Sequence, residues 1–183
     1  MEIGRRFGER TVDKYARAAA ADVKQQLEAG RYLRASFSAA HYVVLSGKTA
    51  WTSEEQERMS AALREETELR LAANDEATAA WRAAYDRMLT SEQAWSEAVL
   101  FRLRNAVAPG KVQADAGRRL FVAAEAADYL LLGGFPFWDQ SELDHMLAAI
   151  TEDFNVCARR GDDIMAADRL VVYKLLAEGA HPG

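Results

Sequence analysis

The chain contains neither glycine nor proline between Gly47 and Pro109. A β-sheet of that length would need several turns, and tight turns draw on these two residue types for their backbone conformations. The same chain has 36 alanines among its 183 residues, whereas valine, isoleucine and threonine together number only 21. Alanine is the best helix former, while β-branched residues favour strands. The sequence therefore predicts an all-α protein.

Apolar residues recur at spacings of three and four along most of the chain, as on one face of an α-helix. The expected helices cover 11–29, 31–46, 54–73, a segment around Trp81, a segment from about 93 to 107, 111–132, and two segments that begin after Asp139 and Asp162. Serine, threonine or aspartate followed three residues later by glutamate or glutamine is typical of a helix start. The pairs that fit are Thr52–Glu55 or Ser53–Gln56, Thr90–Gln93 and Asp139–Glu142. We expect a compact bundle or array of about seven to eight amphipathic helices.

The length fits one domain. We expect a flexible arm over residues 1–10, a single helical domain over 11–179 and a flexible tail over 180–183. No apolar run reaches the length of a membrane span, and the N-terminus has no apolar stretch typical of a secretory signal. We therefore expect a cytoplasmic protein that does not contact membranes. Arginine outnumbers lysine, 18 to 5, as in proteins of GC-rich bacterial or phage genomes.

Charge is distributed unevenly along the chain, whose net charge is −5. Residues 1–34 carry +3 and residues 98–119 carry +4, whereas residues 54–97 and 139–168 each carry −6. We favour solvated helix faces with ion pairs, and keep as an alternative an acidic surface that fits a basic partner. A pI near 5.3 argues against direct nucleic-acid binding, which needs a basic face.

The chain has one metal-like spacing, Glu142 and His145 on one helix face. Helical metal sites of this kind need the motif twice, and Glu142 also has a capping role opposite Asp139. We interpret His41 as a partly buried imidazole with one hydrogen bond, and Cys157 as a small core residue. No acid, base and nucleophile converge in the sequence, so no metal, no cofactor and no enzymatic activity is expected.

Two groups of charged residues lie within the helix predicted over residues 111–132. Glu125 and Asp128 form either an acid/base pair or, as we favour, a pair of carboxylates that meet an arginine such as Arg118 or face water. Lys111, Arg118 and Arg119 lie in the first turns of this expected helix, where they either bind an anion or, more simply, face solvent.

Three aromatic residues occur within four positions, Phe135 to Trp138, directly after two glycines. They either plug the end of the bundle, which we favour, or form an exposed patch of the kind found in binding hot spots. We expect Phe135 to point inward because it directly follows the apolar helix. We expect Trp138 to be partly exposed because it precedes the Asp139 cap.

The leading hypothesis is a non-enzymatic protein–protein interaction module with an assembly, regulatory or inhibitory role. Its partner would be another protein, including a second copy of this chain in a homo-oligomer. The candidate interaction residues are Phe137, Trp138, Arg118 and Arg119. A first alternative is a small-ligand or cofactor-binding protein with a pocket lined by Trp81, Tyr85, Trp95 and Phe121. A second alternative is an acidic decoy that inhibits a nucleic-acid-binding partner.

Overall fold

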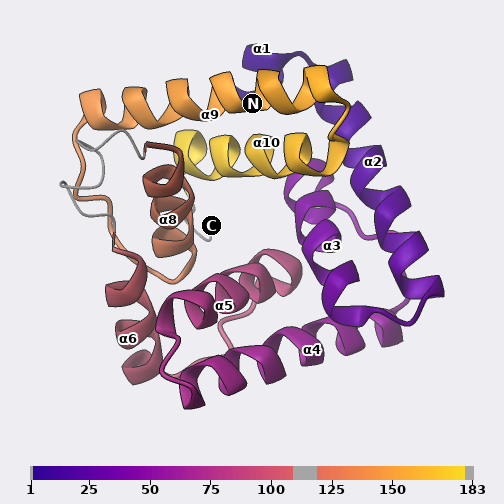
Figure 1. Ribbon diagram of the computed structural model, residues 1–183, viewed down its shortest axis with the longest axis vertical. Coiled ribbons are helices and arrows are strands. Elements are labelled where there is room, and N and C mark those ends of the chain that lie inside the picture. The colour runs from indigo at the N-terminus through magenta and orange to yellow at the C-terminus, as the bar shows by residue number, and fades with distance from the viewer. Residues whose placement is uncertain (1, 109–118, 180–183) are drawn as a thin grey trace.

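The computed structural model describes residues 2–108 and 119–179, and within these ranges it has nine α-helices and no strand (Figure 1). The prediction of a compact all-α fold is confirmed. The helices are α1 (Glu2–Phe7), α2 (Glu9–Glu28), α3 (Tyr32–Ser46), α4 (Ser53–Ala72), α5 (Glu76–Thr90), α6 (Glu97–Val107), α8 (Arg119–Leu131), α9 (Gln140–Arg160) and α10 (Asp163–Glu178). None of the helices in the described part of the chain combines the length and apolar character that a membrane span requires.

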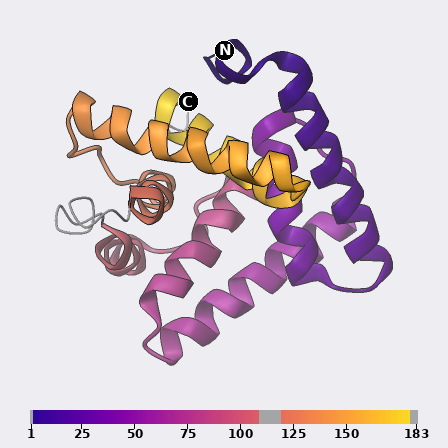
Figure 2. The ribbon, with the colours of Figure 1, turned by 45° about the horizontal axis from the view of Figure 1, so that its top comes forward.

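Consecutive helices pack as pairs, α2 on α3, α4 on α5 and α9 on α10. In Figure 1 these three pairs form three sides of the fold, and α6 with α8 forms the fourth. Helix α10 closes the arrangement, because it packs against α1, α2, α3, α8 and α9. Figure 2 shows the same order from a second direction, with α2 at one edge and α6 and α8 at the other.

The helix starts follow the capping signals of the sequence. The Glu55 amide donates to Thr52 Oγ1 at 3.2 Å, and the Thr52 amide donates to the Glu55 carboxylate at 2.9 Å. Asp139 and Glu142 exchange the same two bonds, both at 2.8 Å, at the start of α9. These capping boxes satisfy backbone N–H groups that have no partner within the helix. Both predicted starts are confirmed.

One predicted start is wrong. The sequence placed a cap at Thr90, but α5 continues to Thr90, whose hydroxyl donates back to the carbonyl of Asp86 at 2.8 Å. Helix α6 instead begins after Ser96, whose side chain accepts a bond from the amide of Val99 at 3.4 Å. Thr90 is the last residue of α5, and the chain leaves that helix at Ser91 with a positive φ of 58°, so Thr90 does not stand at the start of α6.

The N-terminal residues belong to the packed fold. In place of the flexible arm expected over residues 1–10, the structure has α1, in which Ile3 is fully buried. The Phe7 ring meets Phe154 of α9 at 5.1 Å and Tyr173 of α10 at 4.9 Å between ring centroids. Edge-to-face aromatic contacts of this kind stabilise by about 0.5–1.5 kcal/mol beyond the area that they bury.

Helix α4 lies at one edge of the fold (Figure 1). It carries many charged residues and buries only one narrow stripe. Met59 and Leu63 are fully buried, and Thr67 continues the stripe with its hydroxyl bonded to the carbonyl of Leu63. The sequence pattern of Met59, Leu63 and Leu69 predicts that Leu69 belongs to the same stripe, but its side chain is 58% exposed. The expectation fails because Leu69 lies two residues beyond Thr67, on the opposite side of the helix.

The helix predicted over residues 111–132 is described only as α8, from Arg119 to Leu131. Lys111, Arg118 and the tail 180–183 lie outside the described residues, and so does the side chain of Arg119. The interpretations that involve these residues stay predictions. Helix α8 buries residues toward α5, α6, α9 and α10 but is not enclosed on all sides.

Candidate functional site

Three phenylalanines project from neighbouring parts of α6 and the loop before α9. Phe101 of α6 is 60% exposed, and Phe135 and Phe137 of the loop are 78% and 58% exposed. We call these three residues the aromatic face. Exposed apolar side chains are ordinary when they stand singly, but a contiguous group of large ones marks an interaction site.

The backbone at the end of α8 directs Phe135 outward. Gly133 adopts a positive φ of 87°, and the amide of Gly134 donates to the carbonyl of Tyr129 at 2.9 Å. A Cβ at Gly134 would lie only 2.3 Å from the Tyr129 ring. Tyr129 therefore occupies the space at the end of the helix. The prediction that Phe135 points inward is wrong, because another aromatic ring already covers that end.

Phe101 and Phe135 line the same cavity, which has a volume of about 660 Å³ between α6 and the loop. Arg104 fixes its two walls to each other. One guanidinium nitrogen donates to the carbonyl of Leu132 at 3.1 Å, and another pairs with Glu97. Phe101 was not among the candidates predicted from the sequence. Its position does carry a signal, because it lies off the apolar stripe formed by Leu103 and Val107, and a large apolar residue off that stripe is expected to be exposed.

Trp138 connects the aromatic face to the interior. It is half-buried and packs against the core formed by α8, α9 and α10, so the expectation of partial exposure is confirmed. Its ring lies 5.4 Å from Phe137 and 6.4 Å from Tyr129, and Phe137 lies 5.5 Å from Tyr129. Of the loop aromatics, therefore, Trp138 helps to close the bundle, whereas Phe135 and Phe137 form an exposed patch.

A second cluster, buried and polar, lies where α3, α5 and α10 meet. His41 Nε2 lies 3.1 Å from both the Tyr85 hydroxyl and Asp168 Oδ1, and that hydroxyl donates to the same carboxylate oxygen at 2.9 Å. Arg169 donates to Asp168 at 2.5 Å and to Asp153 of α9 at 2.5 Å. The cluster joins four helices by hydrogen bonds and ion pairs.

The pKa values of the carboxyl groups near this cluster move in opposite directions. Burial raises the pKa of Asp168, but the hydrogen bonds and charges of His41, Arg169 and Tyr85 outweigh it and lower the pKa to about 2. Burial raises the pKa of Asp128 well above its ordinary value, and the charges of Asp168 and Glu125 raise it further. Asp168 therefore stabilises the fold as an anion, whereas a charged Asp128 opposes it.

Arg118, the arginine that the sequence favoured as partner for the carboxyls of α8, lies outside the described residues, so that pairing stays a prediction. Within the described residues no hydrogen bond joins Glu125 or Asp128 to another side chain. Burial also raises the pKa of Glu125. Burial and the neighbouring Asp153 raise the pKa of the Cys157 thiol, which disfavours the nucleophilic thiolate form of this residue.

Of the four aromatic residues of the predicted ligand pocket, Trp81 and Tyr85 are in contact, with ring centroids 5.6 Å apart, whereas Trp95 and Phe121 lie in other surroundings. The Trp81 ring stacks on Phe37 at 5.6 Å, and the Arg82 guanidinium lies 4.2 Å above it. Tyr85 is bonded within the polar cluster, Trp95 packs against the α5–α6 core, and Phe121 is 68% exposed. The faces of Trp81 are thus already occupied by neighbours.

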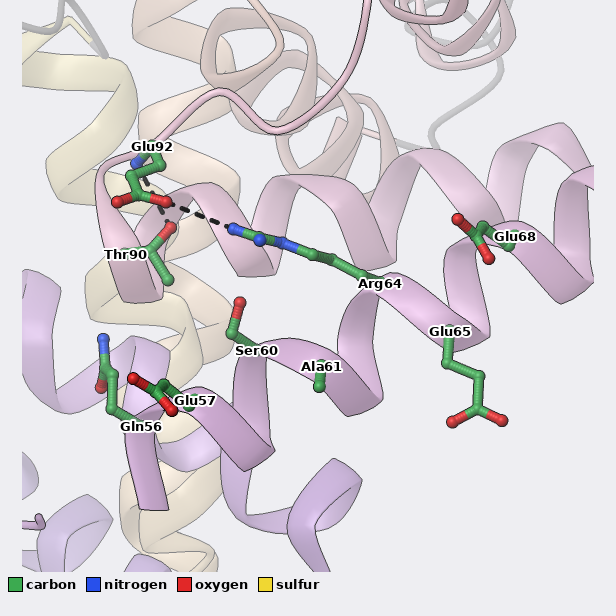
Figure 3. Close-up of a pocket in the computed structure, with 9 residues that line it drawn as sticks. All are labelled: Gln56, Glu57, Ser60, Ala61, Arg64, Glu65, Glu68, Thr90 and Glu92. Carbon is green, nitrogen blue, oxygen red and sulfur yellow. Dashed lines mark hydrogen bonds and ion pairs between the residues drawn. The ribbon is translucent and has the colours of Figure 1, made fainter. Parts of the chain in front are cut away.

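The acidic residues of the two negatively charged segments do not form one surface. A cavity of about 700 Å³ on α4 is lined by four glutamates (Figure 3). Arg64 crosses it, with Nε 2.8 Å from Asp86 and a terminal nitrogen 3.4 Å from Glu92. The acids of α9 lie on the opposite side of the fold from α4 (Figure 1). The hypothesis of a single acidic surface made by both segments is therefore corrected.

The two residues of α9 that have the spacing of metal ligands are Glu142 and His145. Glu142 accepts the Asp139 amide in the capping box, and His145 is exposed. The described residues contain no group of three or more histidine, cysteine or acidic side chains arranged to hold a metal ion.

Comparison of the chain with protein-family models, curated proteins and solved structures gives no match.

Proposed function

We propose that the protein is a non-enzymatic interaction module with a regulatory or assembly role, and that the aromatic face binds its protein partner. The observation that carries the proposal is the exposure of Phe101, Phe135 and Phe137 on adjoining elements. Aromatic side chains dominate binding hot spots, where they are covered by the partner at the centre of the interface.

The apolar area of the aromatic face is in the range of a binding surface. At exposures of 60%, 78% and 58%, three phenylalanines present about 300–500 Å², since each covers about 150–250 Å². A contiguous patch of a few hundred Å² is as large as the largest on a typical monomer, and such patches are often functional.

The aromatic face is also held in one conformation. Arg104 links α6 to the carbonyl of Leu132, and Tyr129 fills the space beside Gly134, so both walls of the cavity are fixed before a partner arrives. A surface that is already ordered loses less conformational entropy on binding. The face therefore combines a large apolar area with a low cost of ordering.

In-cell photocrosslinking tests the proposal. Phe137 is replaced by the photoreactive analogue p-benzoylphenylalanine, and Leu69, which is equally exposed at 58% but lies on α4, is replaced in a matched control. We expect a discrete crosslinked polypeptide with the Phe137 variant and none with the Leu69 variant. Equal crosslinking at both positions, or none at Phe137, would contradict the proposal.

A further inference from the structure

We infer that the partner of the aromatic face is a second copy of this chain, related to the first by a two-fold axis. This inference rests on the proposed function, because it names the occupant of the same face. In a two-fold interface the same patch meets itself, so a projecting group and the hollow that receives it must lie on one surface.

The aromatic face carries both a projection and a hollow. Phe135 is the most exposed large apolar side chain among the described residues, and it stands at the rim of the cavity that Phe101 and Tyr129 also line. The cavity volume of about 660 Å³ lies within the range of about 300–1,000 Å³ that holds drug-sized molecules, so it has room for a phenyl ring. Phe135 of each copy can thus enter the cavity of the other copy. Because the two contacts use both faces, the assembly stops at two copies.

The area of the face matches what a dimer of ordinary size needs. A standard interface covers about 800 Å² on each partner, and slightly more than half of that area is apolar. The three exposed phenylalanines supply about 300–500 Å² of apolar surface from side chains that are 60%, 78% and 58% exposed. Most of the apolar share of each half is therefore already present on the aromatic face.

The charge of the aromatic face suits a second copy of the chain better than the charge of the acidic surfaces of α4 and α9 does. The charged residues that line the cavity are Arg87, Glu97 and Arg104, and each bonds within the chain, Arg87 to the carbonyl of Ser91 and Arg104 to Glu97. Each copy of this face carries two arginines and one glutamate, so two copies bring together only a small excess of positive charge. The exposed acids of α4 and α9 would repel their own copies, because like charges across an interface disfavour association.

Analytical ultracentrifugation of the full chain, from low micromolar to several hundred micromolar, tests the inference. The wild type should approach twice the chain mass of 20.3 kDa. Phe135→Glu should raise the dimer dissociation constant by a factor of about 30 or more, as expected for loss of one hot-spot side chain. The matched control is Leu69→Glu, which adds the same charge at an exposed apolar position of α4.

The result expected is a dimer for the wild type and for Leu69→Glu, and a monomer with unchanged circular dichroism for Phe135→Glu. A wild type that stays monomeric at the highest concentration, or a Phe135→Glu variant that stays dimeric, would overturn the inference. If the wild type is monomeric while the photoreactive Phe137 variant crosslinks to a different polypeptide, the proposed function stands and only the second copy is wrong.

Discussion

Asp168 and Asp128 provide a matched test of the polar cluster, because the same Asp→Asn change should shift stability in opposite directions. The pKa of Asp168 is lowered from 3.8 to about 2 in the folded protein. At 1.36 kcal/mol for each pH unit, the negative charge of Asp168 contributes about 2 kcal/mol to the free energy of unfolding at neutral pH. Asp168→Asn should remove that contribution.

For a chain of this length, a loss of about 2 kcal/mol corresponds to a melting temperature lower by about 4–8 °C. The sign follows from proton binding. An aspartate whose folded pKa is lowered stabilises above its unfolded pKa, and this contribution disappears as the pH falls from about 4 toward 2. The difference between wild type and Asp168→Asn should therefore be largest at neutral pH and should close as the pH approaches about 2.

Asp128→Asn should instead raise the free energy of unfolding at neutral pH. Burial and the charges of Asp168 and Glu125 raise the pKa of Asp128, so the ionised carboxyl is less stable in the folded protein than in the unfolded chain. The neutral amide removes that penalty. A carboxyl whose pKa is raised in the folded protein opposes folding only at pH values above its pKa in the unfolded chain. The stability gained by Asp128→Asn should therefore shrink as the pH falls toward the ordinary pKa of aspartate.

Urea unfolding followed by far-UV circular dichroism, repeated across the pH range, measures both variants. If Asp128→Asn destabilises the protein as much as Asp168→Asn does, the assignment of opposite roles is refuted. A difference for Asp168→Asn that does not change with pH would show that the residue acts through shape and not through charge.

Three further changes probe packing and capping by urea unfolding. Gly134→Ala should destabilise by about 1–3 kcal/mol, because its Cβ would meet the Tyr129 ring at 2.3 Å; an unchanged midpoint would contradict that contact. Leu63→Ala should lose about 2–5 kcal/mol, whereas Leu69→Ala, at an exposed position of the same helix, should change stability by less than about 0.5 kcal/mol. Asp139→Ala should lose about 0.5–2 kcal/mol with the capping box of α9, and a variant as stable as the wild type would show that the cap contributes nothing.

Local signals in the sequence predicted the helices well, because helix periodicity and capping depend on residues within a few positions of each other. The Asp139–Glu142 capping box is confirmed. At Asn74 the sequence left open a break or one long helix, and the structure has a break, with a positive φ of 57°. The cap expected at Thr90 failed because α5 continues through Thr90 and α6 begins only after Ser96, and the local pattern does not show where the first helix ends.

The candidate site was less predictable, because it depends on contacts between distant parts of the chain. Phe137, a candidate interaction residue from the sequence, is exposed, but the direction of Phe135 depends on Tyr129, which reaches the space beside Gly134. The link from Arg104 to the carbonyl of Leu132 joins residues 28 positions apart. The cluster of His41, Tyr85 and Asp168 spans still larger separations, and no local pattern marks it.

The position of α10 has a consequence for how the protein is made. Helices α2 and α3 need α10 to cover their apolar faces, yet more than a hundred residues separate Ser46 from Asp163. At about 5–20 residues per second, a ribosome takes roughly 6–23 s to synthesise that interval. During this time the first helical pair has an uncovered apolar surface, so nascent chains should be substrates for chaperones until the last helix emerges.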